Sequence, residues 1–433
     1  VLTTDFEPYF YIIPKSDPKS IQKEIASLKL QDSEGHPITI KRTDIQKKTV
    51  DGKDISVIKI IANTSKDVPK LKDAIKHMDF VKDKREYDIP FAKRYLFDRD
   101  IRPMSWLKVK GKEIKSNYNC DTTIVAETIE KEENKTFPNL NILAFDLETI
   151  PLANNRQQII MASLASNKGL KRVLTYQKAT QKDTIIKESE KELIEQLIQD
   201  IQNEKPDFIV TYNGDAFDFT VLKDRADHYK ISLNLGFNTR PIQFLRRGMT
   251  NAAMIKGSAH IDLYQFIFKV MRTTLKSETL TLDNVASELI GEKKLDMDFE
   301  EMQQLWKDRE DLKTIAEYNL HDSVITLKLA EYILPNIFAM CHLTNQIPSD
   351  AGRSTYGQLV ESFAMKNAAR LNTIVPNRPS SDTISDRKRI DAIEGAFVVE
   401  PEPGLYTDIA VLDFKSLYPS IIVSHNISPE TLN

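Results

Sequence analysis

The sequence predicts an α/β protein, in which a mixed sheet covered by helices forms the central domain. Between residues 136 and 334, short β-branched and aromatic runs alternate with longer segments of helical periodicity, a pattern typical of α/β domains. The 433 residues are 41% hydrophobic and 28% charged, as in globular proteins. At about 150 residues per domain, the length predicts roughly three domains.

Composition also narrows the class of protein. No run of about 18 apolar residues or secretory signal is present, so we expect no membrane partner. Cys120 and Cys341 are far apart in the chain, which favours a reducing, cytoplasmic setting. The net charge of −3 requires any nucleic-acid binding to come from local basic surfaces or metal ions. Because the first residue is Val1, we expect the native start to lie upstream.

Residues 1–135 predict an α+β N-terminal domain. They contain the strand-like runs PYFYII and ISVIKIIA, and a helix over 67–77 with a proline in its first turn. The polar stretch 129–139 is typical of a linker. The mainly helical residues 335–376 are expected to return to this domain.

The elements of the central domain, 136–334, follow in order. NILAFDLETI, IIMASLA and KRVLTY predict three strands. A helix comes next, with Ser189 and Glu192 spaced as a capping box and Pro206 closing it. DFIVTYNGDAFDF predicts a strand and a loop, and DLKTIAEYNLHDSVITLKLAEYIL a final helix.

Three short motifs in this domain carry carboxylates. Asp146 and Glu148 are two residues apart on a predicted strand, so both lie on one face. Tyr318 and Asp322 are four apart on a predicted helix and also share a face, whereas the neighbouring His321 favours a packing or surface role.

The remaining motif is YNGDAFDF. Asn213 and Gly214 indicate a tight turn, Phe217 is expected to supply an apolar anchor, and either Asp215 or Asp218 the charge. Each motif alone is equally consistent with an ordinary surface pair or helix cap. Together they offer several carboxylate oxygens, which suit Mg²⁺ or Mn²⁺ rather than zinc. Two such ions about 4 Å apart catalyse phosphodiester hydrolysis.

FDLET, NGDAFDF and YNLHD, in this order, resemble the three exonuclease motifs of family B DNA polymerases. The resemblance implies a ribonuclease H-like exonuclease domain of the DEDD class that removes nucleotides from a single-stranded 3′ end. It assigns one metal ion to Asp146, Glu148 and Asp322, and a second to Asp218 with Asp146. Tyr318 would orient the attacking water.

The last segment, 377–433, resembles the start of the palm domain of the same family. DFKSLYPSII is similar to its first palm motif, with Asp413 expected at the end of a strand. The resemblance makes Asp413 a metal ligand and assigns nucleotide binding to Leu417 and Tyr418. A second acidic DTD motif does not occur in the sequence, so we expect no polymerisation by this chain alone. Primer-template DNA, a dNTP and a sliding clamp would be partners of the full protein.

The N-terminal region resembles the archaeal branch of the family, in which this domain captures template uracil. The alternative is a small core with an arginine held in structural contacts. The residues at matching positions are Pro8, Val68, Ile89, Pro90, Phe91 and Arg94.

Five further residues are candidates for DNA contact. They are Asn213, Phe217, Arg246, Arg247 and Gly395. Gly395 follows Ile393, where the family has a tyrosine, so the balance of editing and synthesis is expected to differ. The basic run at 387–389 is equally consistent with a solvated surface.

We therefore expect the N-terminal part of a replicative DNA polymerase that carries a proofreading exonuclease, cytoplasmic and associated with the nucleoid. Two alternatives stay open: a module that senses template uracil, and a freestanding DEDD exonuclease.

Overall fold

The computed structural model describes most of the chain. The described residues are 2–3, 5–27, 30–32, 34–75, 78–117, 122–132, 138–153, 156–236, 240–247, 250–293, 295, 297–389, 395, 397–428 and 431. They form two compact units. The larger unit comprises Val1–Asp5 with Leu96–Lys366, and the smaller unit Phe6–Tyr95 with Asn367–Asn433.

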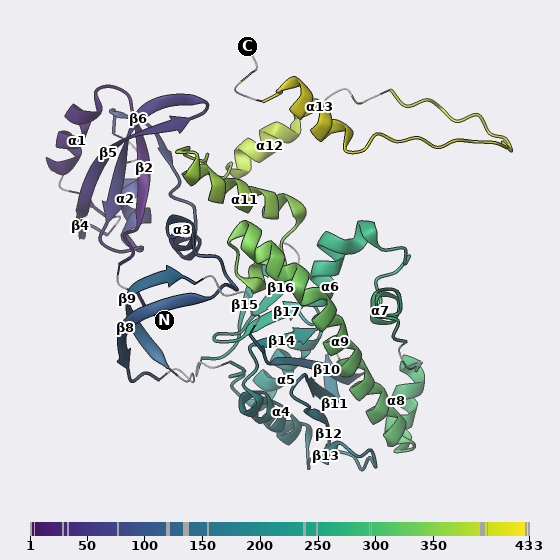
Figure 1. Ribbon diagram of the computed structural model, residues 1–433. Coiled ribbons are helices and arrows are strands. Elements are labelled where there is room, and N and C mark those ends of the chain that lie inside the picture. Colours follow the sequence, from purple (N-terminus) through teal and green to yellow (C-terminus); the bar gives the residue numbers. More distant parts are fainter. Residues whose placement is uncertain are drawn as a thin grey trace. The chain divides into compact units, whose positions relative to one another are not determined.

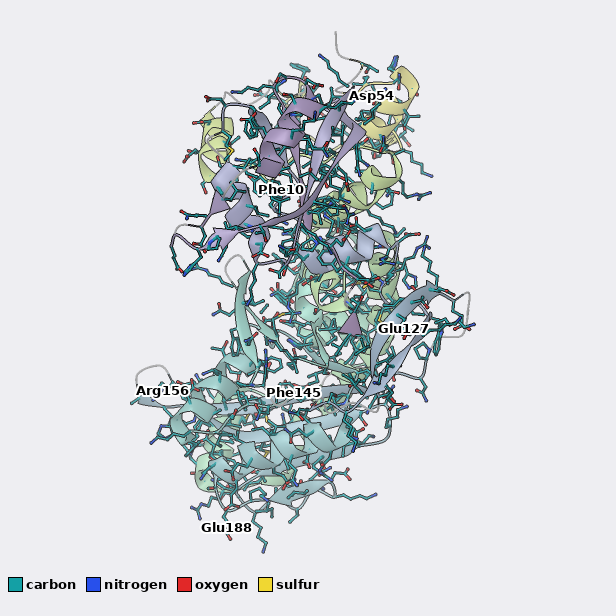
Figure 2. All side chains as sticks on the ribbon, turned by 90° about the vertical axis from the view of Figure 1, so that its left-hand side faces the viewer. Phe10, Asp54, Glu127, Phe145, Arg156 and Glu188 are labelled. Carbon is teal, nitrogen blue, oxygen red and sulfur yellow. The ribbon has the colours of Figure 1, made fainter. Side chains whose placement is uncertain are left out.

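An antiparallel sheet of strand order β5-β6-β2-β7 organises the smaller unit. Phe10 (Figure 2) and Ile12 of β2 are fully buried, together with Ile21 and Ile25 of α1 and Leu71 of α2. The elements are β2 (Tyr9–Pro14), α1 (Pro18–Ser27), β3 (Leu30–Gln31), β4 (Pro37–Ile38), β5 (Ile40–Val50), β6 (Lys53–Ala62), α2 (Asp67–Ile75), β7 (Val81–Arg85) and α3 (Phe91–Asp98). The helix predicted over 67–77 is confirmed as α2, and residues 76 and 77 lie outside the described residues.

The chain returns to this unit within the last turn of α11 (Tyr356–Arg370), at Asn367, and α12 (Ser381–Arg389) and α13 (Leu417–His425) follow. The prediction of a strand ending at Asp413 is wrong. Residues 409–414 form no strand and their side chains are exposed. An isolated strand leaves its N–H and C=O groups unpaired, and none of the described residues pairs with this segment.

A six-stranded mixed sheet of order β13-β12-β11-β10-β14-β17 organises the larger unit, as the sequence predicts. Its strands are β10 (Ile142–Pro151), β11 (Gln157–Ser166), β12 (Lys171–Thr175), β13 (Thr184–Ile186), β14 (Phe208–Thr211) and β17 (Ala259–Asp262). Its helices are α4 (Glu190–Glu204), α5 (Asp218–Tyr229), α6 (Leu263–Phe266), α7 (Leu282–Ile290), α8 (Phe299–Asp308), α9 (Leu312–Thr344) and α10 (Pro348–Ala351). A π-helical turn, Ile267–Met271, and a 3₁₀ turn, Arg272–Thr274, follow α6.

Smaller sheets complete this unit. The strands β1 (Leu2–Thr3), β9 (Thr123–Lys131) and β8 (Leu107–Ile114) form one of them, and β15 (Gln243–Arg247) and β16 (Thr250–Met254) form a hairpin.

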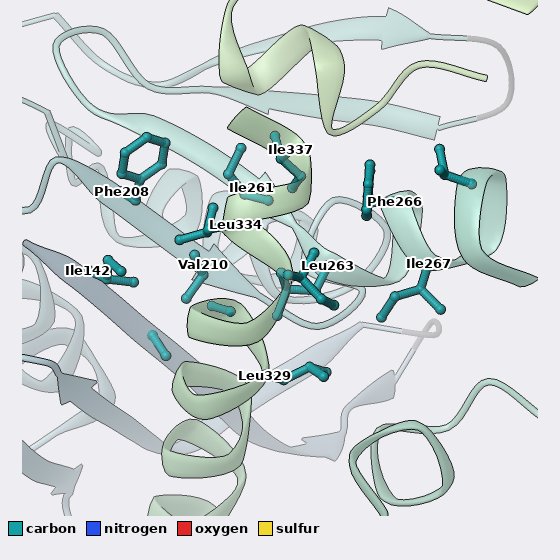
Figure 3. Close-up of a cluster of buried hydrophobic side chains, with 14 of the residues drawn as sticks. Ile142, Phe208, Val210, Ile261, Leu263, Phe266, Ile267, Leu329, Leu334 and Ile337 are labelled. Carbon is teal, nitrogen blue, oxygen red and sulfur yellow. The ribbon is translucent and has the colours of Figure 1, made fainter. Parts of the chain in front are cut away.

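Helices cover both faces of the six-stranded sheet (Figure 1). Leu143 and Phe145 of β10 pack with α4 and α5 on one face. On the opposite face, side chains of β10, β14 and β17 meet those of α9, including Ile142, Val210 and Leu329 (Figure 3). Alternate residues of β10 therefore face different helices, as expected of a strand.

The helix α9 is longer than the predicted element and changes the expected domain limits. It runs without a break from Leu312 to Thr344, so the boundary expected at 334 falls inside a helix. Pro335 lies within it. The return to the N-terminal region starts at Asn367 rather than 335, and residues 96–135 group with the larger unit. Packing against the long helix and the sheets, rather than the linker-like composition near 129–139, sets these limits.

By length and apolar composition α9 could cross a membrane, but half of its most apolar window is buried inside the protein. Its buried side includes Cys341, whose thiol pKa is raised by burial to about 12. Cys120 lies outside the described residues. The burial of α9 against the sheet identifies it as a core helix.

Candidate metal centre

One row of side chains on β10 changes from apolar to acidic as it approaches the end of the strand. Ile142 and Ala144 are buried in the cluster that includes α9. Asp146 and Glu148 continue the same alternation and are half-buried, whereas Leu147 between them is buried on the opposite face. The two-residue spacing therefore places both carboxylates on one face, as predicted, and this is the face that α9 covers.

Helix α9 brings a third carboxylate to this row. A carboxylate oxygen of Asp322 lies within 4.8 Å of those of Asp146 and Glu148, and these two lie equally close to each other. Asp322 is 4% exposed. Three carboxylates this close repel one another, and a divalent cation with hard oxygen ligands relieves that repulsion.

The height of α9 on the sheet is fixed by serine hydroxyls. Asp146 pairs with Ser163 of β11 in the strand register. The Ser163 hydroxyl donates to the backbone carbonyl of Asn319 at 2.7 Å and lies 2.7 Å from the Ser323 hydroxyl. Asn319 and Ser323 flank Asp322 on the helix, so these bonds set Asp322 opposite the acidic end of β10.

Asn319 belongs to the centre, and the sequence interpretation missed it. Its side-chain Nδ2 donates to Asp146 Oδ2 at 2.9 Å, and the residue is fully buried. It lies within YNLHD, directly after Tyr318, but the motif gave no sign that its amide meets Asp146. Tyr318 itself is half-buried, one helical turn before Asp322, in agreement with the predicted spacing.

Asp218 begins α5 beside the unpaired edge of β10. The pairing of β10 with β14 ends at Ala144 and Val210, which leaves the later N–H groups on that edge open. The backbone of Leu147 lies beside the Asp218 carboxylate and favours its ionised form. Burial, followed by the charge of Asp262, raises the Asp218 pKa to about 7. Asp218 is not within the group of three, but it lies beside the backbone of Leu147, the residue between Asp146 and Glu148.

The other aspartate of NGDAFD is held in structural contacts, so Asp218 stays the predicted source of charge at the site. Asp215 accepts from Arg353 Nε at 2.6 Å and Nη2 at 3.0 Å, and its Oδ1 lies 3.4 Å from His260 Nδ1. The backbone N–H of Ala253 donates to it at 2.8 Å. Burial alone would raise the Asp215 pKa, but bonds and charges from His260 and Arg353 outweigh it and hold the pKa well below its usual range.

The loop that leads into these aspartates has a sterically restricted backbone. Asn213 has φ of +67°, and a Cβ at Gly214 would lie 2.2 Å from Thr211 Oγ1. The carboxylate of Asp262, at the end of β17, accepts from the N–H of Asn213 at 2.9 Å and of Asp215 at 3.1 Å. Asp262 is fully buried, so it anchors the loop that delivers Asp218. The sequence interpretation missed this residue as well.

The expectation that Phe217 anchors this loop in the core is wrong, because its side chain is 40% exposed. Phe219 takes the anchoring position: it is fully buried, with its ring 5.2 Å from that of Phe145 in an edge-to-face contact. The start of α5 turns residue 219 toward the sheet and leaves Phe217 facing solvent, where it is accessible to a ligand.

The other predicted DNA contacts are on the surface. Arg246 is exposed on the β15–β16 hairpin, and the Arg247 side chain lies outside the described part of the structure. Gly395 is exposed, with Ile393 outside the described residues. The side chains of the basic run 387–389 are also outside them.

The predicted palm residues are exposed within the smaller unit. Asp413 lies before α13, and Leu417 and Tyr418 form the first residues of that helix. Their roles stay predictions.

The predicted uracil-binding residues occupy different environments. Pro8 and Ile89 are buried, Pro90 is exposed and Phe91 is half-buried. Val68, on α2, is fully buried in the core. Arg94 donates to Glu86 Oε2 at 2.5 Å, to the Glu86 carbonyl at 2.9 Å and to the Tyr9 hydroxyl at 3.1 Å. These are the contacts expected of a structural arginine, so uracil binding stays a prediction.

A second group of ligand atoms, Asp32, Glu34 and His36, lies within 4.8 Å in the smaller unit. Asp32 Oδ1 accepts from the N–H groups of Glu34 at 3.0 Å and His36 at 2.9 Å, and Lys70 Nζ lies 2.8 Å from Oδ2. One oxygen of Asp32 thus stabilises a turn and the other pairs with a lysine of α2, which distinguishes this group from the one on β10.

Comparison with known proteins gives matches over nearly the whole chain. A model described as DNA polymerase family B, exonuclease domain, matches residues 82–285, and one described as DNA polymerase family B matches residues 352–433. The chain is 34% identical over 434 residues to a DNA polymerase of Desulfurococcus sp. (strain Tok), covering 99% of this chain and 51% of that protein. It is 36% identical over 433 residues to a DNA polymerase of Pyrococcus horikoshii, covering 99% and 32% respectively.

A solved structure agrees with these matches. The family B DNA polymerase from the hyperthermophilic archaeon Pyrobaculum calidifontis aligns with a TM-score of 0.79 at 25% identity, over 99% of this chain and 53% of that one. The chain thus spans about half of these relatives, or less.

Proposed function

Because the chain belongs to DNA polymerase family B, we propose that its larger unit is a metal-dependent 3′→5′ exonuclease that edits DNA ends. One observation carries the proposal: oxygens of Asp146, Glu148 and Asp322 lie within 4.8 Å of one another. Asp218 lies beside the backbone of the intervening Leu147. A cluster of this kind has little value as a hydrophobic core contact, since burying several like charges is costly.

The donor atoms suit the proposed ions. All are carboxylate oxygens, which Mg²⁺ and Mn²⁺ prefer. In this proposal Asp146, Glu148 and Asp322 hold one ion, and Asp218 with Asp146 holds the other. Two bound ions supply an activated water and charge stabilisation for phosphodiester hydrolysis.

The remaining residues position the DNA end. Tyr318, one helical turn from Asp322, orients the attacking water through its hydroxyl. The exposed ring of Phe217, at the start of α5, offers a stacking surface for a base next to Asp218. Base stacking on aromatic rings tolerates any sequence, as an editing enzyme requires.

The wider role follows from the family. We propose that this chain forms the editing part of a longer polymerase, in which Asp413, Leu417 and Tyr418 take part in binding metal and dNTP. Primer-template DNA is the corresponding partner, the sliding clamp a further one, and association with the nucleoid the corresponding location.

The test is release of nucleotides from a labelled single-stranded 3′ end by this chain, with and without Mg²⁺. Asp146→Ala and Asp218→Ala should reduce the rate by at least 100-fold, as roughly expected for loss of a metal ligand. Asp224→Ala is the matched control for Asp218, because Asp224 is on the same helix and pairs with Arg156 on the surface. Digestion that persists without metal, or survives Asp218→Ala, would reject the proposal.

The same protein tests uracil recognition. Strands containing uracil should bind more tightly than matched thymine strands if the residues near Phe91 form a pocket. Equal affinity would leave Arg94 with only its structural contacts to Glu86 and Tyr9.

A further inference from the structure

We propose that Asn319 is a positioning residue for the metal centre, which holds the Asp146 carboxylate turned toward Glu148 and Asp322. This inference rests on the proposed nuclease function. It starts from one contact, the 2.9 Å hydrogen bond from Asn319 Nδ2 to Asp146 Oδ2. An ionised carboxylate accepts only, so the amide must present its nitrogen to Asp146.

Given its surroundings, Asn319 contributes less to the stability of the fold than an apolar residue at this position would. It is fully buried on α9, in a stretch that also buries Ile315, Ala316 and Leu320. Asparagine is a weak helix former. Within the described residues, its side-chain Oδ1 is buried and has no hydrogen-bond partner. A buried unsatisfied acceptor costs about 1–3 kcal/mol, so an apolar residue would serve packing better.

A backbone contact also holds Asn319 in place, so that its side-chain amide starts from a fixed position. The Asn319 carbonyl accepts the Ser163 hydroxyl, and Ser163 is the register partner of Asp146. Asn319 is therefore held at two points, by its carbonyl to β11 and by its amide to β10. A carboxylate bonded through one oxygen cannot rotate freely, so this bond limits the directions in which Asp146 presents its oxygens. Loss of a hydrogen bond that orients a metal ligand typically weakens metal binding by about 10- to 100-fold.

The test measures Mn²⁺ affinity by calorimetry on the full chain, at about pH 8, using wild type, Asn319→Leu and Asn319→Ala. Leucine keeps the branched shape of asparagine, although it is larger, and cannot donate. We expect both variants to bind Mn²⁺ at least tenfold more weakly. In chelator, Asn319→Leu should unfold at the same or a higher urea concentration than wild type, because the unsatisfied amide is gone.

Thr344→Ala is the matched control, since it removes a buried side-chain hydrogen bond on the same helix, to the Met340 carbonyl, about six helical turns away from Asp322. Its Mn²⁺ affinity should stay close to wild type. Unchanged affinity in Asn319→Leu and Asn319→Ala, or equal loss in Thr344→Ala, would overturn the proposal. Failure of both Asn319 variants to fold would also overturn it, by making Asn319 structural. Absence of Mn²⁺ binding by wild type would instead reject the nuclease function on which the inference rests.

Discussion

Replacement of Asp322 by asparagine should stabilise the metal-free protein and remove its response to metal. Asp322 is 4% exposed, and its oxygen lies within 4.8 Å of those of Asp146 and Glu148. At an effective dielectric constant of about 20, two unit charges 4.8 Å apart repel by roughly 3.5 kcal/mol. Each charge is spread over two oxygens, and clustered carboxylates share protons, so we expect a gain of about 1–3 kcal/mol in the free energy of unfolding.

The assay is urea unfolding in chelator and in excess Mg²⁺. Wild type should gain stability with Mg²⁺, since a ligand that binds only the folded state stabilises it, whereas Asp322→Asn should gain little. Glu317→Gln is the matched control, because Glu317 is exposed on the same helix and pairs only weakly with Lys313 at 3.5 Å. The reasoning is refuted if Asp322→Asn is less stable than wild type in chelator, or if Mg²⁺ stabilises both equally.

Three further predictions concern the NGDAFD loop. Because the Asp218 pKa is raised to about 7, Asp218 is ionised above that pH and protonated below it, so Mn²⁺ affinity measured by calorimetry should fall as the pH drops from about 8 to 6. Gly214→Ala should lower stability by about 1–3 kcal/mol and slow nuclease activity, because its Cβ would meet Thr211; unchanged urea unfolding would contradict this. Arg353→Met should destabilise by about 3–5 kcal/mol, and Asp215→Asn in the same protein should recover part of the loss. The pKa of Asp215 is lower in the folded protein than its usual value. The ionised carboxylate therefore stabilises the folded protein above about pH 4, and this stabilisation is lost as the pH falls through the pKa of the folded state.

Local geometry explains which parts of the site were predictable. The alternation along β10 depends only on the two-residue repeat, so Asp146 and Glu148 could be placed on one face from the sequence. The Ser189 cap of α4 is equally local: its hydroxyl accepts the Glu192 N–H at 3.3 Å. Tyr318 and Asp322 follow from the helical repeat.

Long-range contacts explain what was missed. The Asn319–Asp146 bond spans 173 positions and the Arg353–Asp215 pair 138. The periodicity of the sequence does not predict which turn of α9 packs against which strand. That position is determined by the Ser163 hydroxyl bonds and by the packing of the sheet. The role of Asp262 also depends on the parallel pairing of β14 with β17, which places it below the NGDAFD loop.

The strand expected before Asp413 shows a further limit. Its apolar run IAVLDF has strong β-propensity, but propensity measures fit to a sheet rather than an intrinsic backbone preference. Without a pairing strand among the described residues, the segment does not form one. Sequence reasoning identified the motif but not the tertiary contacts that its structure requires.

The most direct measurement is a crystal structure of this chain with Mn²⁺, located by anomalous scattering. We predict one peak among Asp146, Glu148 and Asp322, and a second between Asp146 and Asp218, both lost in Asp146→Ala. A protein that digests 3′ ends in Mn²⁺ but shows no peak at these four carboxylates would contradict the account.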